Sequence, residues 1–178
     1  KTLVMNFPAL KGDKVTFIGS TFLKHGEKDP YLNHCIVLDT CEPMEGVENS
    51  EIESYRTEKE VLLAWKELIQ REDPDIIIGY NIFGFDYEFM LHRANETDCC
   101  EEFLKLSRNC DEVCGERSKK TGKYQIQESS IVIASGQHDL KFIKMNGRIQ
   151  IDLYNYFRRD YNLSSYKLDS VSGHFIGD

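Results

Sequence analysis

A short apolar run inside residues 73–86 constrains the fold of this chain most. Residues 76–78 are three isoleucines in succession, and such a run is typical of a strand buried on both faces in a largely parallel sheet. A glycine ends the run, and Asn81 and Asp86 follow where the chain leaves the strand. Ligands and catalytic groups collect at the carboxyl ends of strands in open α/β sheets, so Asp86 is a candidate catalytic carboxylate.

Length and charge restrict the class of protein. The chain has 178 residues, enough for one domain with its own core, and it contains no apolar run long enough to span a membrane. The net charge is −8, whereas a protein that binds nucleic acid mainly through phosphates should be basic. We therefore expect no membrane partner and no autonomous nucleic-acid-binding module. An acidic metal site, or one part of a larger chain with basic surfaces elsewhere, agrees with this charge.

The cysteines give no recognisable metal-binding pattern. Six cysteines lie at positions 35, 41, 99, 100, 110 and 114, and none forms a Cys-x-x-Cys pair. Because the usual zinc spacings are absent, we expect free thiols in a reducing intracellular compartment.

The first half of the chain alternates between strand and helix patterns. We expect strands at residues 15–22 and 35–38 and then a helix at 57–71. A third strand at 76–78 and a second helix at 85–94 follow. Thr57 and Glu60 fit a capping box at the start of the first helix. Residues 39–56 are expected to form a loop. The two early strands favour an antiparallel pair, and the helix-linked third strand favours a parallel addition to their sheet.

The second half begins with the polar stretch 95–123. We then expect a pair of strands at residues 124–135 and 138–145, joined around Ser135-Gly136. A further strand at 148–151 and two helices at 153–161 and 164–176 follow. Asn146-Gly147 is a strong hairpin signal that leads into the further strand. Ser164 or Ser165 can cap the last helix, and Gly177 can stop it. The fold class is mixed α/β.

The string DPDIIIGYNIFGFDYEFM, at residues 73–90, resembles the second exonuclease motif of family B DNA polymerases. That motif is an asparagine, a short spacer, an aromatic residue and an aspartate, here Asn81, Phe85 and Asp86. The stretches 146–153 and 161–178 resemble the segment between the second and third motifs of this family. The resemblance covers nearly the whole chain and is closest to polymerases of large DNA viruses, with eukaryotic delta-type enzymes related.

The resemblance implies a 3′→5′ proofreading exonuclease domain with a ribonuclease-H-like fold, in which helices flank a mixed sheet with a β-hairpin insertion. Such a domain removes mispaired 3′ nucleotides with two Mg²⁺ or Mn²⁺ ions, four carboxylates and an assisting tyrosine. Oxygen ligands suit these ions, which activate a water and stabilise the leaving oxygen. By resemblance Asp86 is a catalytic metal ligand, and Asn81 and Phe85 bind the 3′ end of single-stranded DNA.

The resemblance also implies partners and a location. DNA and the remaining polymerase domains of a parent chain are the implied partners, and a sliding clamp is a candidate. The expected location is intracellular, either a host nucleus or a viral replication compartment.

The chain departs from the family pattern on both flanks. The first motif, an aspartate–apolar–glutamate on the first strand, should precede residue 15, but the only acid there is Asp13. Residues 51–53 have a similar shape but are expected in a loop, so we reject them. Tyr156 and Asp160 fit the third motif, yet they precede a segment that should come before it, so we consider them a decoy. We expect residues 1–178 to be a partial exonuclease domain, truncated at both ends, that lacks its first strand and is inactive alone.

Structural alternatives exist for each residue. Asp86 and Asp152 are each favourable helix caps, Asn81 can close a turn, and Phe85 can belong to the core. A cluster of exposed basic side chains is more often solvated than bound to DNA, although contact is an open alternative for Lys119, Lys120 and Lys123. At the level of function, the alternatives are a stand-alone nuclease of the same fold and a degenerate exonuclease-like domain with only a DNA-binding or structural role.

Overall fold

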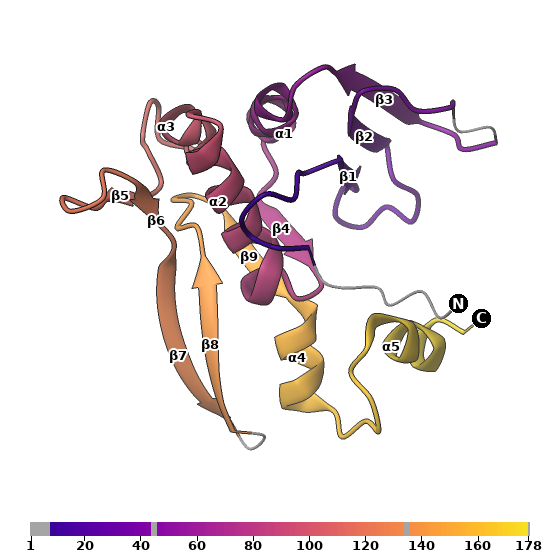
Figure 1. Ribbon diagram of the computed structural model, residues 1–178. Coiled ribbons are helices and arrows are strands. Elements are labelled where there is room, and N and C mark those ends of the chain that lie inside the picture. The colour runs from indigo at the N-terminus through magenta and orange to yellow at the C-terminus, as the bar shows by residue number, and fades with distance from the viewer. Residues whose placement is uncertain (1–7, 44–45, 134–135, 178) are drawn as a thin grey trace, which may run out of the picture.

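The computed structural model describes residues 8–43, 46–133 and 136–177, and it shows a mixed α/β domain with several small sheets (Figure 1), as predicted. The strands are β1 Phe17–Phe22, β2 Leu32–Leu38, β3 Ser50–Tyr55, β4 Ile76–Gly79, β5 Glu116–Arg117, β6 Tyr124–Gln125, β7 Gln127–Ile133, β8 Gly136–Phe142 and β9 Ile149–Asp152. The helices are α1 Glu58–Glu72, α2 Tyr87–Glu96, α3 Cys100–Phe103, α4 Leu153–Asp160 and α5 Leu168–Phe175, with a π-helical turn, η1, at Ile82–Asp86.

The first sheet has the order β1-β2-β3. β1 and β2 are antiparallel, which confirms the predicted pair, and β3 runs parallel to β2. β2 begins at Leu32, earlier than predicted, because Leu32, His34 and Ile36 all point into the core. The expected loop at 39–56 is wrong in part, since residues 50–55 form β3. Mostly polar side chains on an edge strand leave little hydrophobic signal there.

Helix α1 begins and ends as the sequence predicts, within one residue. The capping box is present: the Thr57 backbone N–H donates to Glu60 Oε2 at 2.9 Å, and the Glu60 backbone N–H donates to Thr57 Oγ1 at 3.3 Å. The apolar face of α1 includes Val61, Leu62 and Leu68, which are buried in the same core as Ile36 of β2 and the apolar residues of α2.

A buried ion pair joins α1 to α2. The Arg93 Nη2 atom lies 2.7 Å from Glu58 Oε2, and the two side chains are 6% and 4% exposed. Glu58 Oε1 accepts hydrogen bonds from Arg93 Nε at 2.8 Å and from the Val15 backbone N–H at 2.9 Å. The pair therefore also fixes the segment that leads into β1.

Glu58 gives this domain an acid-sensitive contact. Burial raises the pKa of the Glu58 carboxyl, but hydrogen bonds from Arg93 and Val15 outweigh burial, so the pKa lies below its ordinary value. The contribution of ionised Glu58 to the free energy of unfolding is complete above the unfolded-state pKa of about 4.3. It is lost as the pH falls through the lower folded-state pKa. We expect the free energy of unfolding to fall less steeply below pH 4.3 in Glu58→Gln than in the original chain, as measured by urea denaturation. Equal acid sensitivity of both proteins would contradict this assignment.

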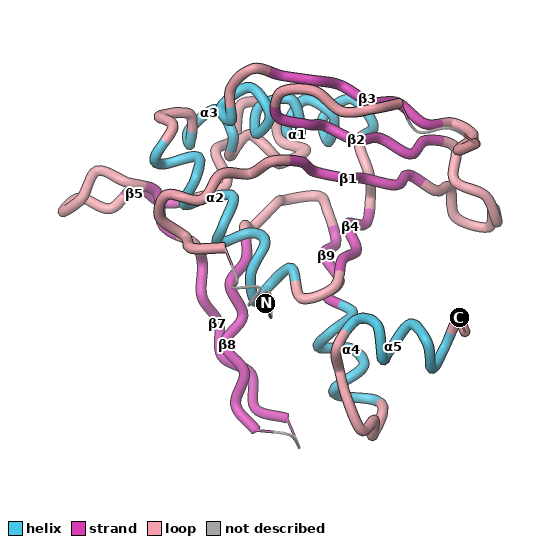
Figure 2. Tube along the Cα trace, turned by 45° about the vertical axis from the view of Figure 1, so that its right-hand side comes forward, coloured by secondary structure: helices cyan, strands magenta, loops and turns pink. Residues whose placement is uncertain are grey.

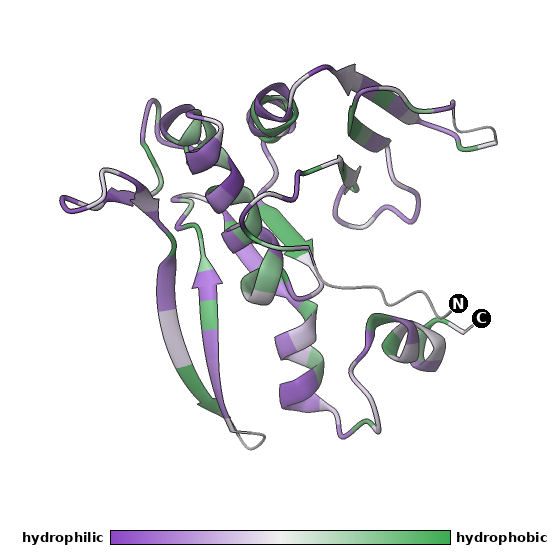
Figure 3. Cartoon of the chain, viewed as in Figure 1, coloured by the Kyte–Doolittle hydropathy of each residue, from purple (hydrophilic) through white to green (hydrophobic). Residues whose placement is uncertain are grey.

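β4 forms a separate two-stranded sheet with β9, to which it is parallel. The predicted addition of β4 to the first sheet is therefore wrong. The prediction that β4 is buried on both faces is also wrong, because Ile76 is 44% and Ile78 is 57% exposed. Figure 3 shows β4 as an apolar strand, yet within the described residues it pairs only with β9, so one edge remains open.

The predicted second helix has two parts. The π-helical turn η1 precedes α2, and the backbone N–H groups of Gly84 and Phe85 both donate to the Asn81 carbonyl. Asn81 itself has a left-handed conformation, with φ of 63°. The helical segment therefore starts earlier and ends later than predicted, at Ile82 and Glu96. Hydrogen bonds to the Asn81 carbonyl form its first turn.

The predicted strand pair is confirmed as the antiparallel hairpin of β7 and β8, which extends away from the other elements (Figure 2). Ser135 of its expected turn lies outside the described residues. The hairpin predicted at Asn146-Gly147 is wrong, although a turn is present with φ of 82° at Gly147. β9 instead pairs with β4, and just before β9 the Arg148 side chain donates to Asp73 Oδ1 at 2.7 Å and to the Leu106 carbonyl at 2.9 Å.

The last two helices are present as predicted, but α5 begins four residues later than expected. α4 ends one residue early, and Gly177, with φ of 88°, follows α5 and donates to the Ser172 carbonyl. The predicted serine cap of α5 is wrong, because Lys167 occupies the N-cap position and makes no side-chain cap. None of the described helices is long and apolar enough to cross a membrane.

Candidate functional site

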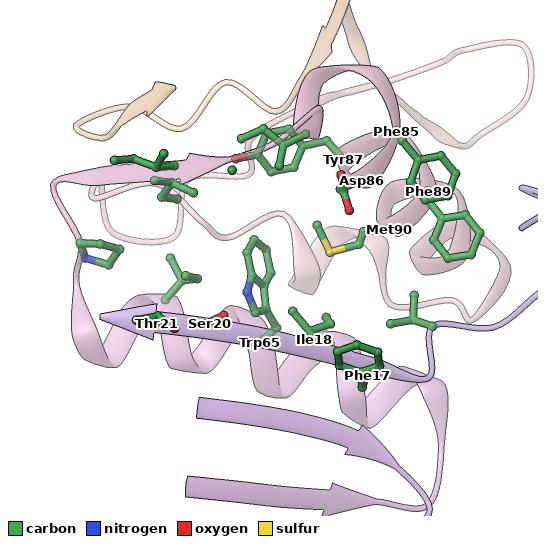
Figure 4. A pocket seen from close by; sticks show the side chains of 18 of the residues that line it. Phe17, Ile18, Ser20, Thr21, Trp65, Phe85, Asp86, Tyr87, Phe89 and Met90 are labelled. Atoms are coloured by element: carbon green, nitrogen blue, oxygen red, sulfur yellow. The ribbon is translucent and has the colours of Figure 1, made fainter. Parts of the chain in front are cut away.

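A cavity of about 680 Å³ lies between the first sheet and β4. It is lined by every residue of β1 and of β4, and Trp65 and Met90 also line it (Figure 4). Asp86 is the only acidic residue among the described residues that line this cavity. The cavity therefore combines two strand edges with a single carboxylate.

Asp86 lies at the end of η1, where α2 begins. Its side chain makes no helix-capping hydrogen bond within the described part of the chain, so the capping alternative lacks support. The residue is solvent-exposed through the cavity, yet the apolar walls partly desolvate the carboxylate and raise its pKa, to which the negative charge of Asp152 adds. A cation bound beside this carboxylate would stabilise its charged form.

Asn81 closes the turn between β4 and Asp86. The Asn81 backbone N–H donates to Asp152 Oδ1 at 2.8 Å, and that of Phe83 donates to Asp152 Oδ2 at 3.0 Å. A Cβ atom added at Gly84 would lie 2.2 Å from Asn81 Oδ1, so the glycine is required for this packing. The turn-closing alternative for Asn81 is thus confirmed, and its side chain is held on the turn that carries Asp86.

Substitution of Gly84 tests this packing. We expect Gly84→Ala to displace the Asn81 side chain and to destabilise the domain by roughly 1–3 kcal/mol, the usual cost of overpacking. Urea denaturation measures the change, and Gly19→Ala is a matched control, because a Cβ atom at Gly19 meets nothing within 4 Å. Equal stability of the two variants would show that the turn tolerates a methyl group.

Phe85 serves as core and as cavity wall. Its ring stacks on that of Phe89, with centroids 5.2 Å apart and an interplanar angle of 19°. Phe85 and Phe89 both line the cavity (Figure 4). A flat aromatic surface of this kind can stack against a nucleotide base.

The described residues do not complete a metal site by themselves. No group of three or more His, Cys, Asp or Glu side chains that could hold a metal is found in residues 8–43, 46–133 and 136–177. Asp152 contributes to the raised pKa of Asp86, but both of its carboxylate oxygens already accept backbone N–H groups. Asp86 is thus a single available ligand.

The three candidate lysines lie away from the cavity lining. They are exposed around the short hairpin of β5 and β6: Lys119, Lys120 and Lys123. Arg117 Nε donates to the Gly122 carbonyl at 2.5 Å and closes this hairpin. The structure therefore does not bring these lysines together with Asp86.

The carboxylates rejected from the sequence have other partners. Glu51 and Glu53 were expected in a loop, but they lie in β3. Glu53 Oε1 lies 3.2 Å from His34 Nε2. Arg71 Nη2 lies 3.9 Å from Glu51 Oε2, and Arg71 Nη1 lies 3.8 Å from Glu53 Oε1. Asp13 accepts a hydrogen bond from the Ala9 backbone N–H at 2.6 Å. None of these acids lines the cavity.

The Tyr156 and Asp160 pair lies on α4. The Tyr156 ring packs against Tyr161 with centroids 6.0 Å apart, and Asp160 forms an ion pair with Arg159 at 2.7 Å. Neither residue lines the cavity, which agrees with the interpretation of this pair as a decoy.

The cysteines are unpaired thiols, as expected. Cys99, Cys100 and Cys114 are buried, and burial raises the pKa of Cys100 to about 12. A thiol with this pKa is inert at neutral pH, so the buried cysteines are packing residues.

Asp152 is the site residue whose full role the sequence does not reveal. The expected cap is confirmed, because its side chain accepts from the Tyr154 backbone N–H. The bonds to Asn81 and Phe83 span about seventy residues of sequence and depend on the pairing of β9 with β4. In the sequence, the only local indication of this role is an aspartate placed between a predicted strand and a predicted helix.

Comparison with known proteins gives a consistent family. Residues 1–171 match the model described as "DNA polymerase family B, exonuclease domain". The chain is 47% identical to the DNA polymerase of Phaeocystis pouchetii virus, 41% to that of Pyramimonas orientalis virus and 38% to the DNA polymerase delta catalytic subunit of Arabidopsis thaliana. These alignments cover 100%, 95% and 97% of the chain, but only 18%, 13% and 15% of the respective relatives. The chain therefore belongs to the exonuclease-domain family of family B DNA polymerases.

Proposed function

We propose that this domain is the 3′→5′ proofreading exonuclease of a DNA polymerase used in replication. It hydrolyses the terminal phosphodiester of single-stranded DNA, with Asp86 as one of the carboxylates that would hold two Mg²⁺ or Mn²⁺ ions. One observation carries the proposal: Asp86, within a motif of the family, lines the cavity that runs along β1 and β4. The names of the relatives, DNA polymerase and DNA polymerase delta catalytic subunit, support the same function.

The cavity leaves room for the carboxylate ligands that the described residues do not supply. β1 pairs only with β2 and β4 only with β9 within the described ranges, and both strands line the cavity along their full length. We propose that a strand from a segment outside the 178 residues fills this slot, antiparallel to β1 and parallel to β4. It would unite both sheets in a ribonuclease-H-like order and cover Ile76 and Ile78. The aspartate–apolar–glutamate motif belongs on this strand, beside Asp86.

The residues of this chain would then bind and orient the substrate. Two metal ions held at this site would supply an activated water and stabilise the leaving oxygen. Phe85 stacks on the terminal base, which contributes about 1–3 kcal/mol per base in single-strand binding. Asn81 hydrogen-bonds to the same nucleotide, and the apolar walls restrict water around Asp86.

The parent chain supplies the partners. Single-stranded DNA with a 3′ end is the substrate, the other polymerase domains surround this one, and a sliding clamp is a candidate partner at the replication site inside the cell. Lys119, Lys120 and Lys123 contact the DNA backbone. Replacing all three by alanine should reduce the salt-dependence slope of binding by at most about 2, since each phosphate contact on a single strand contributes about 0.7. An unchanged slope would place these lysines in solvent.

A degradation assay tests the proposal. The purified parent protein should shorten 5′-labelled single-stranded DNA from its 3′ end when Mg²⁺ is present, whereas the isolated chain of 178 residues should not. Activity of the isolated chain that is abolished by Tyr156→Phe and Asp160→Asn would contradict both this proposal and the interpretation of the α4 pair as a decoy.

The alternative is a degenerate exonuclease-like domain with a DNA-binding or structural role. It is favoured by the absence of a complete ligand group in the described residues. A parent protein that binds single-stranded DNA but shows no Mg²⁺-dependent degradation would support this alternative.

A further inference from the structure

We propose that Asp152 is a positioning residue for this site, because its carboxylate holds the backbone turn that runs from Asn81 to Asp86, which lines the cavity. The inference rests on the proposed function. Asp152 does not line the cavity and is 4% exposed, so it acts on the reaction through the turn.

The carboxylate of Asp152 joins the ends of two paired strands. Asp152 lies opposite Gly79 in the register of β9 and β4. Its Oδ1 atom accepts from Asn81 N at 2.8 Å and from Tyr154 N at 3.0 Å. Its Oδ2 atom accepts from Phe83 N at 3.0 Å and from Asn155 Nδ2 at 3.3 Å. One side chain thus receives donors from the turn after β4 and from the start of α4.

The turn transmits this position to Asp86. The Asn81 carbonyl accepts the backbone N–H groups of Gly84 and Phe85, which winds the single turn of η1 that ends at Asp86. Asn81 holds a left-handed conformation that is uncommon outside glycine. A displacement of about 1 Å at a reacting group can cost about 100-fold in rate, so fixing this turn matters for the chemistry.

Helix capping alone does not account for these contacts. The bond from Tyr154 N satisfies the cap of α4, and a serine at position 152 could accept it as well. The bonds from Asn81 and Phe83 cross to another strand, beyond the reach of a serine hydroxyl that caps α4. Asp152→Ser therefore separates the two roles of this residue.

The experiment uses the full parent polymerase with Asp152→Ser, Asp152→Asn and the matched control Asn155→Ala. We expect Asp152→Ser to lower the turnover rate of the exonuclease about 10- to 100-fold, as for other supporting residues of a metal site, while nucleotide addition and the melting temperature stay near the original values. Asp152→Asn keeps one acceptor oxygen but turns N–H groups toward Phe83 N, so we expect a similar loss. Asn155→Ala leaves the bonds to the turn intact and should stay within about twofold.

Hydrogen exchange gives a readout besides activity. The backbone amides of Asn81 and Phe83 should exchange faster in Asp152→Ser than in Asn155→Ala. Asp152→Ser with full exonuclease activity, beside an inactive Asp86→Ala, would overturn the inference and leave the proposed function standing. A parallel loss of exonuclease, nucleotide addition and melting temperature would overturn it in favour of a purely structural role. An active Asp86→Ala would overturn the proposed function and the inference with it.

Discussion

Asp86→Ala in the parent polymerase should reduce 3′→5′ degradation of single-stranded DNA by more than about 100-fold, since loss of a metal ligand should exceed the 10- to 100-fold cost of losing its supporting residues. Asp86 is the only acid among the described residues that line the cavity, so none of these neighbours can replace it. Nucleotide addition depends on other domains and should stay near its original rate. A primer-degradation assay and a primer-extension assay on one preparation measure both activities.

Asp75→Ala is the matched control for this prediction. Asp75 lies just before β4, its side chain is 83% exposed, and it pairs with Arg108 at 2.6 Å. We expect both activities to persist in this variant. If Asp86→Ala abolished nucleotide addition together with degradation, Asp86 would have a structural role and the proposed chemistry would be wrong.

Arg93→Met should destabilise the domain by about 3–5 kcal/mol, because it leaves the Glu58 carboxylate buried without its partner. Both side chains are at least nine-tenths buried, and the pair connects α1, α2 and the segment before β1. Methionine preserves much of the volume, so the loss reports the charge rather than a cavity. Urea denaturation of the chain, followed by fluorescence of its single tryptophan, Trp65 on α1, measures the effect.

Arg159→Met is the matched control, because its pair with Asp160 is on the surface and Arg159 is 61% exposed. Such a pair contributes about 0–1 kcal/mol. Equal effects of the two substitutions would show that the Glu58–Arg93 pair does not hold the helices together.

Local chemistry allowed the sequence to predict part of the fold. The capping box at Thr57 and Glu60 placed α1 within one residue, because a helix start depends on neighbours in the sequence. The hairpin of β7 and β8 and the stop at Gly177 are similarly local. The motif likewise placed Asp86 after β4, where the next helix begins.

Long-range pairing explains what the sequence could not predict. Ile76 and Ile78 look buried from composition, but the burial of a strand depends on what packs beside it, and one edge of β4 is open within the described part of the chain. Asn146-Gly147 makes a turn, yet Arg148 and the edge of β4 decide where β9 goes. The bonds from Asp152 to the turn follow from that same pairing.

The most direct test is a structure of the parent polymerase bound to single-stranded DNA and Mn²⁺. We predict that the terminal phosphodiester lies beside Asp86, with a metal ion about 2.1 Å from its carboxylate, the distance typical of a small hard cation. We also predict a strand between β1 and β4 and the terminal base against Phe85. A 3′ end bound elsewhere, with no metal at Asp86, would contradict the account.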